Sequence, residues 1–499
     1  MKRTETRERD FWNALFHPRS VAIVGASRDP QKWGFHLLLN VLKGGYAGRI
    51  YPVNPREKEI LGVSVYPSVP RIPEPVDLAI LVVPPADILT VIRDCGRNRT
   101  RFGIVITAGF GEVGPKGKTL QEEMVSLARS LGMRLMGPNC QGIVSTGGAA
   151  LYAHMPPQFP PSGPVGVISQ SGNLATSFIT AGEAMGLGFS RIISSGNEAD
   201  LETTDFLESL AADPQTKVIL SYLEGLKDGR KFFARAKQVS REKPLLIVKA
   251  GQTEAGVRAA FSHTGALSGS DDLFDALLAQ IGGIRAETIE EMVDVAAALI
   301  SQPLPKGRRV GVVTLGGGWG VLAADYCAKA GLTVEELPRK MVKALDAILP
   351  PWWNRLNPVD MVAGYRKGDL ITTLELLLKS DRFDGVLMLG LGWRTARGNI
   401  LIADARNPKD GMASAGEDWI QEEKNIFAGV QEMGRKYGKP ILLASDVIRH
   451  IPGLEESIRA RRVAAYPSLS RAVRAYLGLV HRSERIKGFE DPRSRRGKR

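Results

Sequence analysis

The sequence predicts an α/β protein with a Rossmann-like domain followed by two duplicated flavodoxin-like domains. Short apolar strands alternate with helical patterns along the chain, which is typical of parallel, doubly wound sheets. The 499 residues are too many for one hydrophobic core. Two distant stretches also repeat one pattern of strand, hydroxyl residue, glycine turn and helix. We therefore expect domains at 1–150, 151–304 and 305–481, with a tail at 482–499.

The first domain has the pattern of a dinucleotide-binding fold without its nicotinamide signature. A buried strand over 21–24 runs into a glycine turn at Gly25, and a helical pattern follows over 34–42. The turn lacks the full G-x-G-x-x-G, and the second strand ends in Pro-Val-Asn-Pro, with no acidic residue for a ribose hydroxyl. An acidic residue at this position would repel the 3′-phosphate of a nucleotide such as coenzyme A. Because the residue is missing, coenzyme A fits this domain better than NAD.

The second and third domains follow proline-containing links at 156–161 and 303–307 and open with the repeated pattern. Two later strands and a closing apolar helix also correspond between the copies. The closing helices are expected at 288–300 and 468–480. After the second repeated strand, the first copy has Glu224 where the second has Leu391, and only the first copy carries the loop with His263. This asymmetry indicates that one copy is specialised for chemistry, although neutral drift in a duplicated scaffold is the alternative.

The two glycine turns are candidate phosphate sites, because backbone N–H groups at a helix N-terminus bind phosphate. The predicted phosphate-binding residues are Ser169, Gln170, Ser171 and Gly172 in the first copy, and Gly316, Gly317 and Gly318 in the second. A histidine between such turns can carry a phosphoryl group covalently, provided that an acceptor holds its other ring nitrogen. His263 and Glu224 are the catalytic candidates. Tight turns alone, and a surface loop that caps the next helix, are the alternatives.

Composition and charge exclude several classes of protein. No uninterrupted apolar run is long enough to span a bilayer, and the charged N-terminus is not a signal peptide. The three cysteines are far apart and show no metal spacing, so we expect no metal site and a reducing, cytoplasmic location. Net charge is +13, with much of the excess after residue 482. We expect this basic tail to be a disordered, solubilising end rather than a nucleic-acid-binding segment.

With these residues in hand, the chain resembles the α subunit of NDP-forming acyl-CoA synthetases, such as ADP-forming acetyl-CoA synthetase, in the succinyl-CoA synthetase superfamily. The resemblance covers roughly residues 10–480 and depends on motifs at 21–27, 52–55, 107–112, 137–142, 169–172, 195–200, 262–267 and 357–360. It implies a CoA-binding domain and two ligase-CoA domains, with His263 phosphorylated and Glu224 as its supporting carboxylate. The positions it implies for CoA binding are Gly25, Ser27, Lys32, Val83, Pro84, Pro85 and Asn139.

The reaction that the resemblance implies is acyl-CoA + phosphate + ADP ⇌ carboxylic acid + CoA + ATP, through an acyl phosphate and a phosphohistidine. The family's ATP-grasp domain needs more residues than follow 480, so we expect an ATP-grasp β subunit in a hetero-oligomer, with ATP or ADP and Mg²⁺ bound there. The chain departs from the family at Trp319, where a proline is usual in the glycine turn. A CoA-responsive regulatory protein without turnover and a CoA transferase are the alternative functions.

Overall fold

The structure is a computed structural model that describes residues 11–148, 150–258, 271–362, 366, 368–404, 411–448 and 463–490. It divides into two compact units. Unit 1 consists of residues 1–183 and 188–289, and unit 2 of residues 184–187 and 290–499. Each unit is described by itself below.

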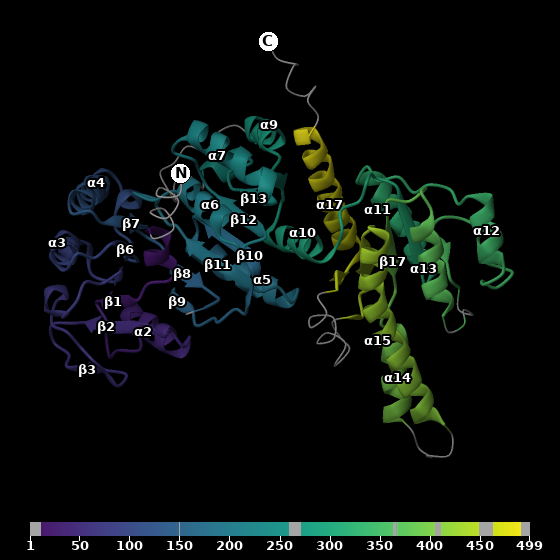
Figure 1. The fold of residues 1–499 in the computed structure, drawn as a ribbon, viewed down its shortest axis with the longest axis horizontal. Coiled ribbons are helices and arrows are strands. Elements are labelled where there is room, and N and C mark those ends of the chain that lie inside the picture. Colours follow the sequence, from purple (N-terminus) through teal and green to yellow (C-terminus); the bar gives the residue numbers. More distant parts are fainter. Residues whose placement is uncertain are drawn as a thin grey trace, which may run out of the picture. The chain divides into compact units, whose positions relative to one another are not determined.

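Unit 1 begins with a parallel five-stranded sheet in the order β2-β1-β5-β6-β7, as expected for a Rossmann-like domain (Figure 1). Every residue of β1 is buried, which explains its continuous apolar sequence. The strands are β1 (Ser20–Val24), β2 (Arg49–Val53), β5 (Leu78–Leu81), β6 (Phe102–Val105) and β7 (Arg134–Met136), with a small pair β3 (Glu59–Ile60) and β4 (Val63–Ser64); the helices are α2 (Trp33–Lys43), α3 (Ile88–Asn98) and α4 (Pro115–Ser130), with single turns η1 (Val69–Arg71), η2 (Pro85–Asp87) and η3 (Gly111–Val113).

The second sheet of unit 1 has seven strands in the order β14-β13-β12-β10-β11-β8-β9. Its strands are β8 (Gly142–Ser145), β9 (Leu151–His154), β10 (Ser162–Ser169), β11 (Phe189–Ser194), β12 (Val218–Leu223), β13 (Leu245–Lys249) and β14 (Ile284–Arg285); its helices are α5 (Gly172–Ala184), α6 (Thr203–Ala212), α7 (Gly229–Glu242) and α9 (Asp271–Ile281). The expected boundary at 150/151 differs from this structure, because the β8–β9 hairpin already belongs to the second sheet. Its strand β8 pairs antiparallel with β11 and places buried Ile143 opposite buried Ile193.

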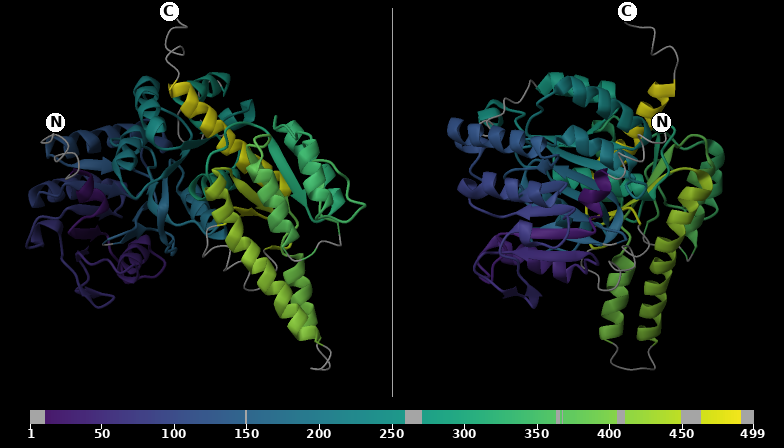
Figure 2. Two further views of the ribbon diagram at one scale, coloured as in Figure 1. Left: turned by 45° about the vertical axis from the view of Figure 1, so that its right-hand side comes forward. Right: turned by 60° about the vertical axis from the view of Figure 1, so that its left-hand side comes forward.

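Unit 2 contains a parallel sheet in the order β16-β15-β17-β18-β19. The helices α14 and α15 run side by side away from this sheet (Figures 1 and 2). The strands are β15 (Val310–Thr314), β16 (Val359–Asp360), β17 (Gly385–Leu389), β18 (Ile441–Ala444) and β19 (Ala465–Tyr466); the helices are α10 (Ile289–Ser301), α11 (Gly317–Lys329), α12 (Arg339–Asp346), α13 (Asp369–Lys379), α14 (Trp393–Ala403), α15 (Met412–Tyr437) and α17 (Leu469–Glu490).

The helices α10 and α17 pack together in unit 2. The two compact units divide at 289/290, because the Asp294 carboxylate of α10 accepts two hydrogen bonds of 2.6 Å from Arg471 of α17. Helix α17 continues through the first part of the expected tail. Arg482 and Ser483 are buried, and Glu484 pairs with Arg308. Residues 482–490 are therefore helical, and 491–499 lie outside the described residues.

The topology confirms two duplicated flavodoxin-like domains. The orders β11-β10-β12-β13-β14 and β16-β15-β17-β18-β19 are the same when each set is numbered along the chain, namely 2-1-3-4-5. Within the described residues, no helix is long and apolar enough to cross a membrane. Cys95, Cys140 and Cys327 are free and buried, and burial raises the pKa of each thiol to about 12.

Candidate functional site

The glycine turn of the first copy joins β10 to α5 and is fixed by side chains at the strand end. The Ser169 hydroxyl donates to the Ser171 carbonyl at 2.6 Å, and the Ser195 backbone N–H donates to the Ser169 carbonyl at 2.8 Å. The first N–H groups of α5 have no partner within the helix and face outward at its N-terminus. A Cβ on Gly172 would lie 2.5 Å from the Gln141 side chain, so any larger residue would require that side chain to move.

Glu224 follows β12 and is 5% exposed. The Gln170 side chain connects it to the turn, because its amide oxygen accepts from the Glu224 backbone N–H at 2.6 Å and from that of Gly225 at 3.1 Å. Burial, followed by the neighbouring Glu224 carboxylate, raises the pKa of Tyr222 to about 12. The structure thus brings the predicted carboxylate and the predicted phosphate turn together. The third predicted member, His263, lies outside the described residues.

A cavity of about 660 Å³ in unit 1 is lined by both the first domain and the first copy. It brings together most of the residues predicted for CoA and phosphate. Those in its wall are Gly25, Lys32, Val83, Pro84, Asn139, Gln170, Ser171 and Gly172. Three predicted residues are absent from the described wall: Ser27 accepts a hydrogen bond from the Asp29 backbone at 3.1 Å, Pro85 begins η2, and Ser169 is fully buried beneath the turn.

The cavity favours a negatively charged ligand at the end formed by β1 and α2. Gly25 has a φ of +94°, and a Cβ there would lie 2.2 Å from the Val82 carbonyl oxygen, so glycine lets the two strand ends meet. Lys32 is the N-cap of α2, and no side chain caps this helix. An ammonium group and open backbone N–H groups therefore lie at one wall.

Asn197 and Gln141 also line this cavity, and the prediction did not assign them a role. The Asn197 amide donates to Glu112 at 2.5 Å. Burial raises the pKa of Glu112, but hydrogen bonds from the Gly109 backbone and from Asn197 outweigh it and hold the pKa below its usual range. The charged Glu112 therefore orients the Asn197 amide. Both cavity residues lie in motifs that the sequence already singled out, at 137–142 and 195–200.

The turn of the second copy repeats the backbone geometry of the first. The Thr314 hydroxyl donates to the Gly316 carbonyl at 2.7 Å, and the Met361 backbone N–H donates to the Thr314 carbonyl at 2.9 Å. Buried Leu391 stands where the first copy has Glu224. The indole of Trp319 lies against Gly390, where a Cβ would approach it to 2.4 Å.

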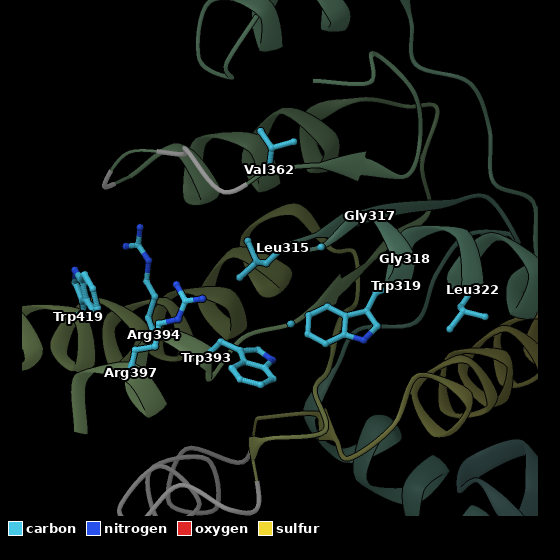
Figure 3. Close-up of a pocket in the computed structure, with 12 residues that line it drawn as sticks. Leu315, Gly317, Gly318, Trp319, Leu322, Val362, Trp393, Arg394, Arg397 and Trp419 are labelled. Carbon is cyan, nitrogen blue, oxygen red and sulfur yellow. The ribbon is translucent and has the colours of Figure 1, made fainter. Parts of the chain in front are cut away.

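A second cavity, of about 820 Å³, lies over this turn in unit 2 (Figure 3). Its wall contains all three predicted glycines, Gly316, Gly317 and Gly318, together with three of the chain's seven tryptophans, Trp319, Trp393 and Trp419. Arg394 and Arg397 of α14 also line it. In Figure 3 these two arginine side chains lie between Trp419 on one side and Trp393 and Trp319 on the other. Within the described residues, no cluster of His, Cys, Asp or Glu could hold a metal ion.

Three family models match successive parts of the chain. A CoA binding domain matches residues 19–146, a succinyl-CoA ligase like flavodoxin domain matches 162–299, and a ligase-CoA domain matches 310–404. The first two models meet in the 660 Å³ cavity, and the third covers the turn of the second copy.

The chain is similar along most of its length to named proteins. The α subunit of acetate–CoA ligase (ADP-forming) II from Pyrococcus furiosus is 41% identical, over 86% of this chain and 88% of that one. A trans-feruloyl-CoA synthase from an unknown prokaryotic organism is 33% identical over 96% of this chain and 66% of its own length. The dinucleotide forming acetyl-coenzyme A synthetase 1 of Candidatus Korarchaeum cryptofilum, solved with phosphate and ADP, has a TM-score of 0.79 and 34% identity, over 96% and 99% of the two chains.

Proposed function

The chain belongs to the ADP-forming acetate–CoA ligases as an α subunit, and from this premise we propose which residues carry the reaction. This enzyme is an acid–thiol ligase, and it uses CoA and a nucleotide. We assign the CoA thioester to the 660 Å³ cavity of unit 1 and the phosphoryl transfer to the turn at Ser169–Gly172 with Glu224 and His263. The observation that carries this assignment is the meeting of the CoA wall and the phosphate turn in one cavity.

The proposed reaction has three steps with balanced bonds. A phosphate oxygen attacks the thioester carbonyl carbon, the C–S bond breaks, and CoA leaves as the thiol with the proton from phosphate. A ring nitrogen of His263 then attacks the acyl phosphate, the P–O bond breaks, and the carboxylate leaves. The phosphoryl group finally passes from His263 to the β-phosphate of ADP, which gives ATP.

The residues of the turn supply positioning and charge stabilisation for these steps. The N–H groups at the start of α5 face the transferred phosphoryl group and favour its negative charge. The Gln170 amide holds the strand end that carries Glu224. The Glu224 carboxylate holds the His263 ring in one tautomer and favours the positive charge that develops on it during transfer. Gly25 and Lys32 lie where the phosphates of CoA need close backbone approach and a cation.

We propose that a partner subunit with an ATP-grasp fold binds ADP and Mg²⁺, in a hetero-oligomer. The name of the Pyrococcus furiosus relative, which is an α subunit, supports a second subunit. The three free cysteines support a reducing, cytoplasmic environment for this assembly. We propose no role in nucleic-acid binding for the basic residues after 482. Nothing observed favours the alternative of a regulatory protein without turnover.

Intact mass measurement of the full chain tests this proposal. The chain is incubated with phosphate and a series of acyl-CoA thioesters, including acetyl-CoA, beside the variant His263→Asn. The expected result is one acid-labile phosphate that requires both an acyl-CoA and His263, and that ADP removes once the partner subunit is added.

Two outcomes would contradict the assignment. Phosphate on the His263→Asn variant would place the covalent step on another residue. Exchange of CoA between thioesters at full rate without phosphate would indicate a transferase, which is the alternative reaction for this fold.

A further inference from the structure

A cluster of charged side chains at the ends of β13 and β14 lies outside the steps assigned so far. Lys249 is the last residue of β13, Asp271 is the first residue of α9, and Arg285 is the last residue of β14. The chain between Lys249 and Asp271 carries His263. We propose that Lys249 is a positioning residue for phosphoryl transfer to His263, because its ammonium group joins the two ends of the segment that carries this histidine. This role rests on the reaction proposed above.

The Lys249 ammonium group contacts both ends of the segment. It donates to the backbone carbonyl of Ala250 at 3.2 Å and to that of Gly251 at 3.1 Å, where the segment begins. Its Nζ lies 3.8 Å from the Asp271 carboxylate, where the segment ends. Lys249 is 6% exposed, and its Nζ also lies over the Phe274 ring of α9, 5.7 Å from the ring centroid. An ammonium group has three N–H donors, so these acceptors replace the water that burial removes.

Both ends of the segment are also held by contacts of their own. The Ala250 backbone N–H donates to the Leu223 carbonyl at 2.8 Å, so the segment starts beside the residue that precedes Glu224. At the other end, the Arg285 guanidinium donates to the two Asp271 carboxylate oxygens at 2.8 Å and 3.1 Å. The dipole of α9 further favours a carboxylate in its first turn. The ammonium group therefore connects two fixed points on either side of the histidine.

The second copy shares one lysine of this region with the first copy and lacks the other. The shared lysine stands just before the strand and donates to two backbone carbonyls, at 2.8 Å and 2.6 Å from Lys243 and at 2.8 Å and 2.7 Å from Lys439. Six residues later, the first copy has Lys249 and the second copy has Ser445. The first lysine thus belongs to the fold of both copies, whereas Lys249 occurs only in the copy that carries His263.

The arginine that holds the Asp271 carboxylate is also confined to the first copy. Arg285 pairs with Ile247 across β13 and β14, and Ala465 pairs with Leu443 across β18 and β19. Ile247 and Leu443 are equivalent, since each is the fourth residue after the shared lysine. Both cations on this carboxylate are therefore absent from the second copy, whose sheet has the same strand order without them. Stabilisation of the first sheet alone is the alternative role of the cluster.

Rapid-quench measurement of acid-labile phosphate on the full chain tests the role of Lys249. The chain is mixed with phosphate and a thioester from the series above, acetyl-CoA first, over a range of thioester concentrations. Lys249→Met removes the charge and keeps the length of the side chain. We expect it to lower the maximal rate about thirtyfold, because small displacements of a reacting group are costly. The thioester concentration at half-maximal rate should change less than about twofold, since Lys249 is outside the cavity wall.

Two further variants test the link between the ends of the segment. Lys249→Arg keeps a cation at this position and should keep the rate within about fivefold of wild type. Asp271→Asn removes the charge at the other end and should lower the rate about tenfold. Because the two residues form one link, Lys249→Met combined with Asp271→Asn should be no more than about twofold slower than Lys249→Met alone.

The matched control is Lys243→Met. Lys243 also donates to two backbone carbonyls, and it lies at the other end of β13. Urea unfolding should show a loss of stability in both methionine variants, but Lys243→Met should keep the phosphorylation rate within about twofold of wild type. Circular dichroism checks that every variant folds.

The outcomes separate this inference from the reaction on which it depends. Equal losses of rate in Lys249→Met and Lys243→Met would leave the cluster with a stabilising role only and overturn the positioning role. If Lys249→Met does not fold, a wild-type rate in Asp271→Asn would overturn it equally. In both cases phosphate on His263 of the wild-type chain leaves the proposed reaction standing. No phosphate on wild-type His263 with any thioester of the series would overturn the reaction, and the positioning role with it.

Discussion

The two glycine turns share a backbone and differ in what lies over it. In both, a strand-end hydroxyl donates to the carbonyl two residues later, at 2.6 Å from Ser169 and 2.7 Å from Thr314. At this turn and at the end of the second repeated strand, the first copy has the polar Gln170 and Glu224, and the second copy has Leu315 and Leu391. The two copies thus share the hydrogen bonds that make the turn, while the side chains beside it are polar in the first copy and apolar in the second. The shared hydrogen bonds therefore hold the backbone of both turns, and the difference in chemistry between the copies depends on a few side chains, such as Glu224 and Leu391.

Replacing Glu224 with leucine should have the largest effect, because it gives the first copy the residue of the second. We expect Glu224→Leu to lower the rate of phosphate incorporation on His263 by about a hundredfold, since the ring would lose the carboxylate that we propose orients it. Rapid-quench measurement of acid-labile phosphate gives this rate. The reciprocal Leu391→Glu should gain no activity. A rate within threefold of wild type in Glu224→Leu would remove this carboxylate from the mechanism.

A methyl group on Gly390 should break the packing that only the second copy has. Gly390→Ala places a Cβ at φ +87° and 2.4 Å from the Trp319 ring, so we expect a loss of about 3 kcal/mol in the unfolding free energy of unit 2. In the control Gly368→Ala the φ is +89° and no atom of the described residues lies within 4 Å of the added Cβ, so this variant should cost only about 1–2 kcal/mol.

Calorimetric scans of the two alanine variants separate strain from overlap. Adding Trp319→Leu to Gly390→Ala should remove the overlap with the indole. The loss of unfolding free energy in this double variant should then equal the loss in Gly368→Ala. Equal losses in Gly390→Ala and Gly368→Ala would mean that the indole does not restrict this position.

Acid should destabilise unit 1 through His154, which lies on the β9 extension of the first copy's sheet. Burial lowers the pKa of His154 to about 4, although its Nε2–H donates to the Gln158 carbonyl at 2.8 Å. The neutral form therefore contributes stability that is complete above the unfolded pKa of about 6.5 and is lost as pH falls towards 4. The expected loss is about 3 kcal/mol.

Urea unfolding of unit 1 at pH 7.5 and 4.5 measures this contribution. The variant His154→Gln keeps a hydrogen-bond donor but does not titrate. The difference between its unfolding free energies at pH 7.5 and 4.5 should therefore be smaller than that of the wild type by about 3 kcal/mol. A variant with the pH dependence of the wild type would assign the acid sensitivity to other groups.

The smallest expected effect tests whether the hydrogen bond shared by the two glycine turns contributes equally to the stability of each unit. Ser169→Ala and Thr314→Val each remove one buried hydroxyl that donates to a carbonyl two residues later. Each should cost about 1 kcal/mol in the stability of its own unit. Thermal unfolding followed by calorimetry measures both. A loss confined to one variant would show that the shared hydrogen bond has different weight in the two copies.

Local patterns predicted the parts of this fold that repeat. The apolar strands, the glycine turns and the correspondence of Glu224 with Leu391 were all visible from spacing, because each depends on a few adjacent residues. The pairing of the β8–β9 hairpin with the second sheet was not predicted because strand pairing is non-local: Gly142 pairs with Ser194, fifty-two residues later. We expected a disordered tail from residue 482, because the sequence there is rich in basic residues. The helix α17 instead continues to 490, and its basic residues include buried ones such as Arg482.

The unit 2 cavity was beyond prediction from the sequence for a similar reason. Trp393, Trp419 and Arg397 lie in none of the motifs that the sequence analysis singled out. Their convergence depends on the close approach of α14 and α15 and on Glu423, which caps a helix from thirty-one residues away. A contact between residues so far apart in the chain leaves no short sequence motif. By contrast, the 660 Å³ cavity is lined by strand ends that motifs already marked.

The burial of Cys95, Cys140 and Cys327 has a practical consequence for observing the enzyme at work. With thiol pKa values of about 12, almost no thiolate forms at neutral pH, so maleimides and other thiol reagents should leave these three residues untouched. The wild-type chain is then already a background for single-site labelling. One cysteine introduced beside His263 and a second on α5 would accept a pair of fluorophores, and their energy transfer would report the position of the histidine during each turnover.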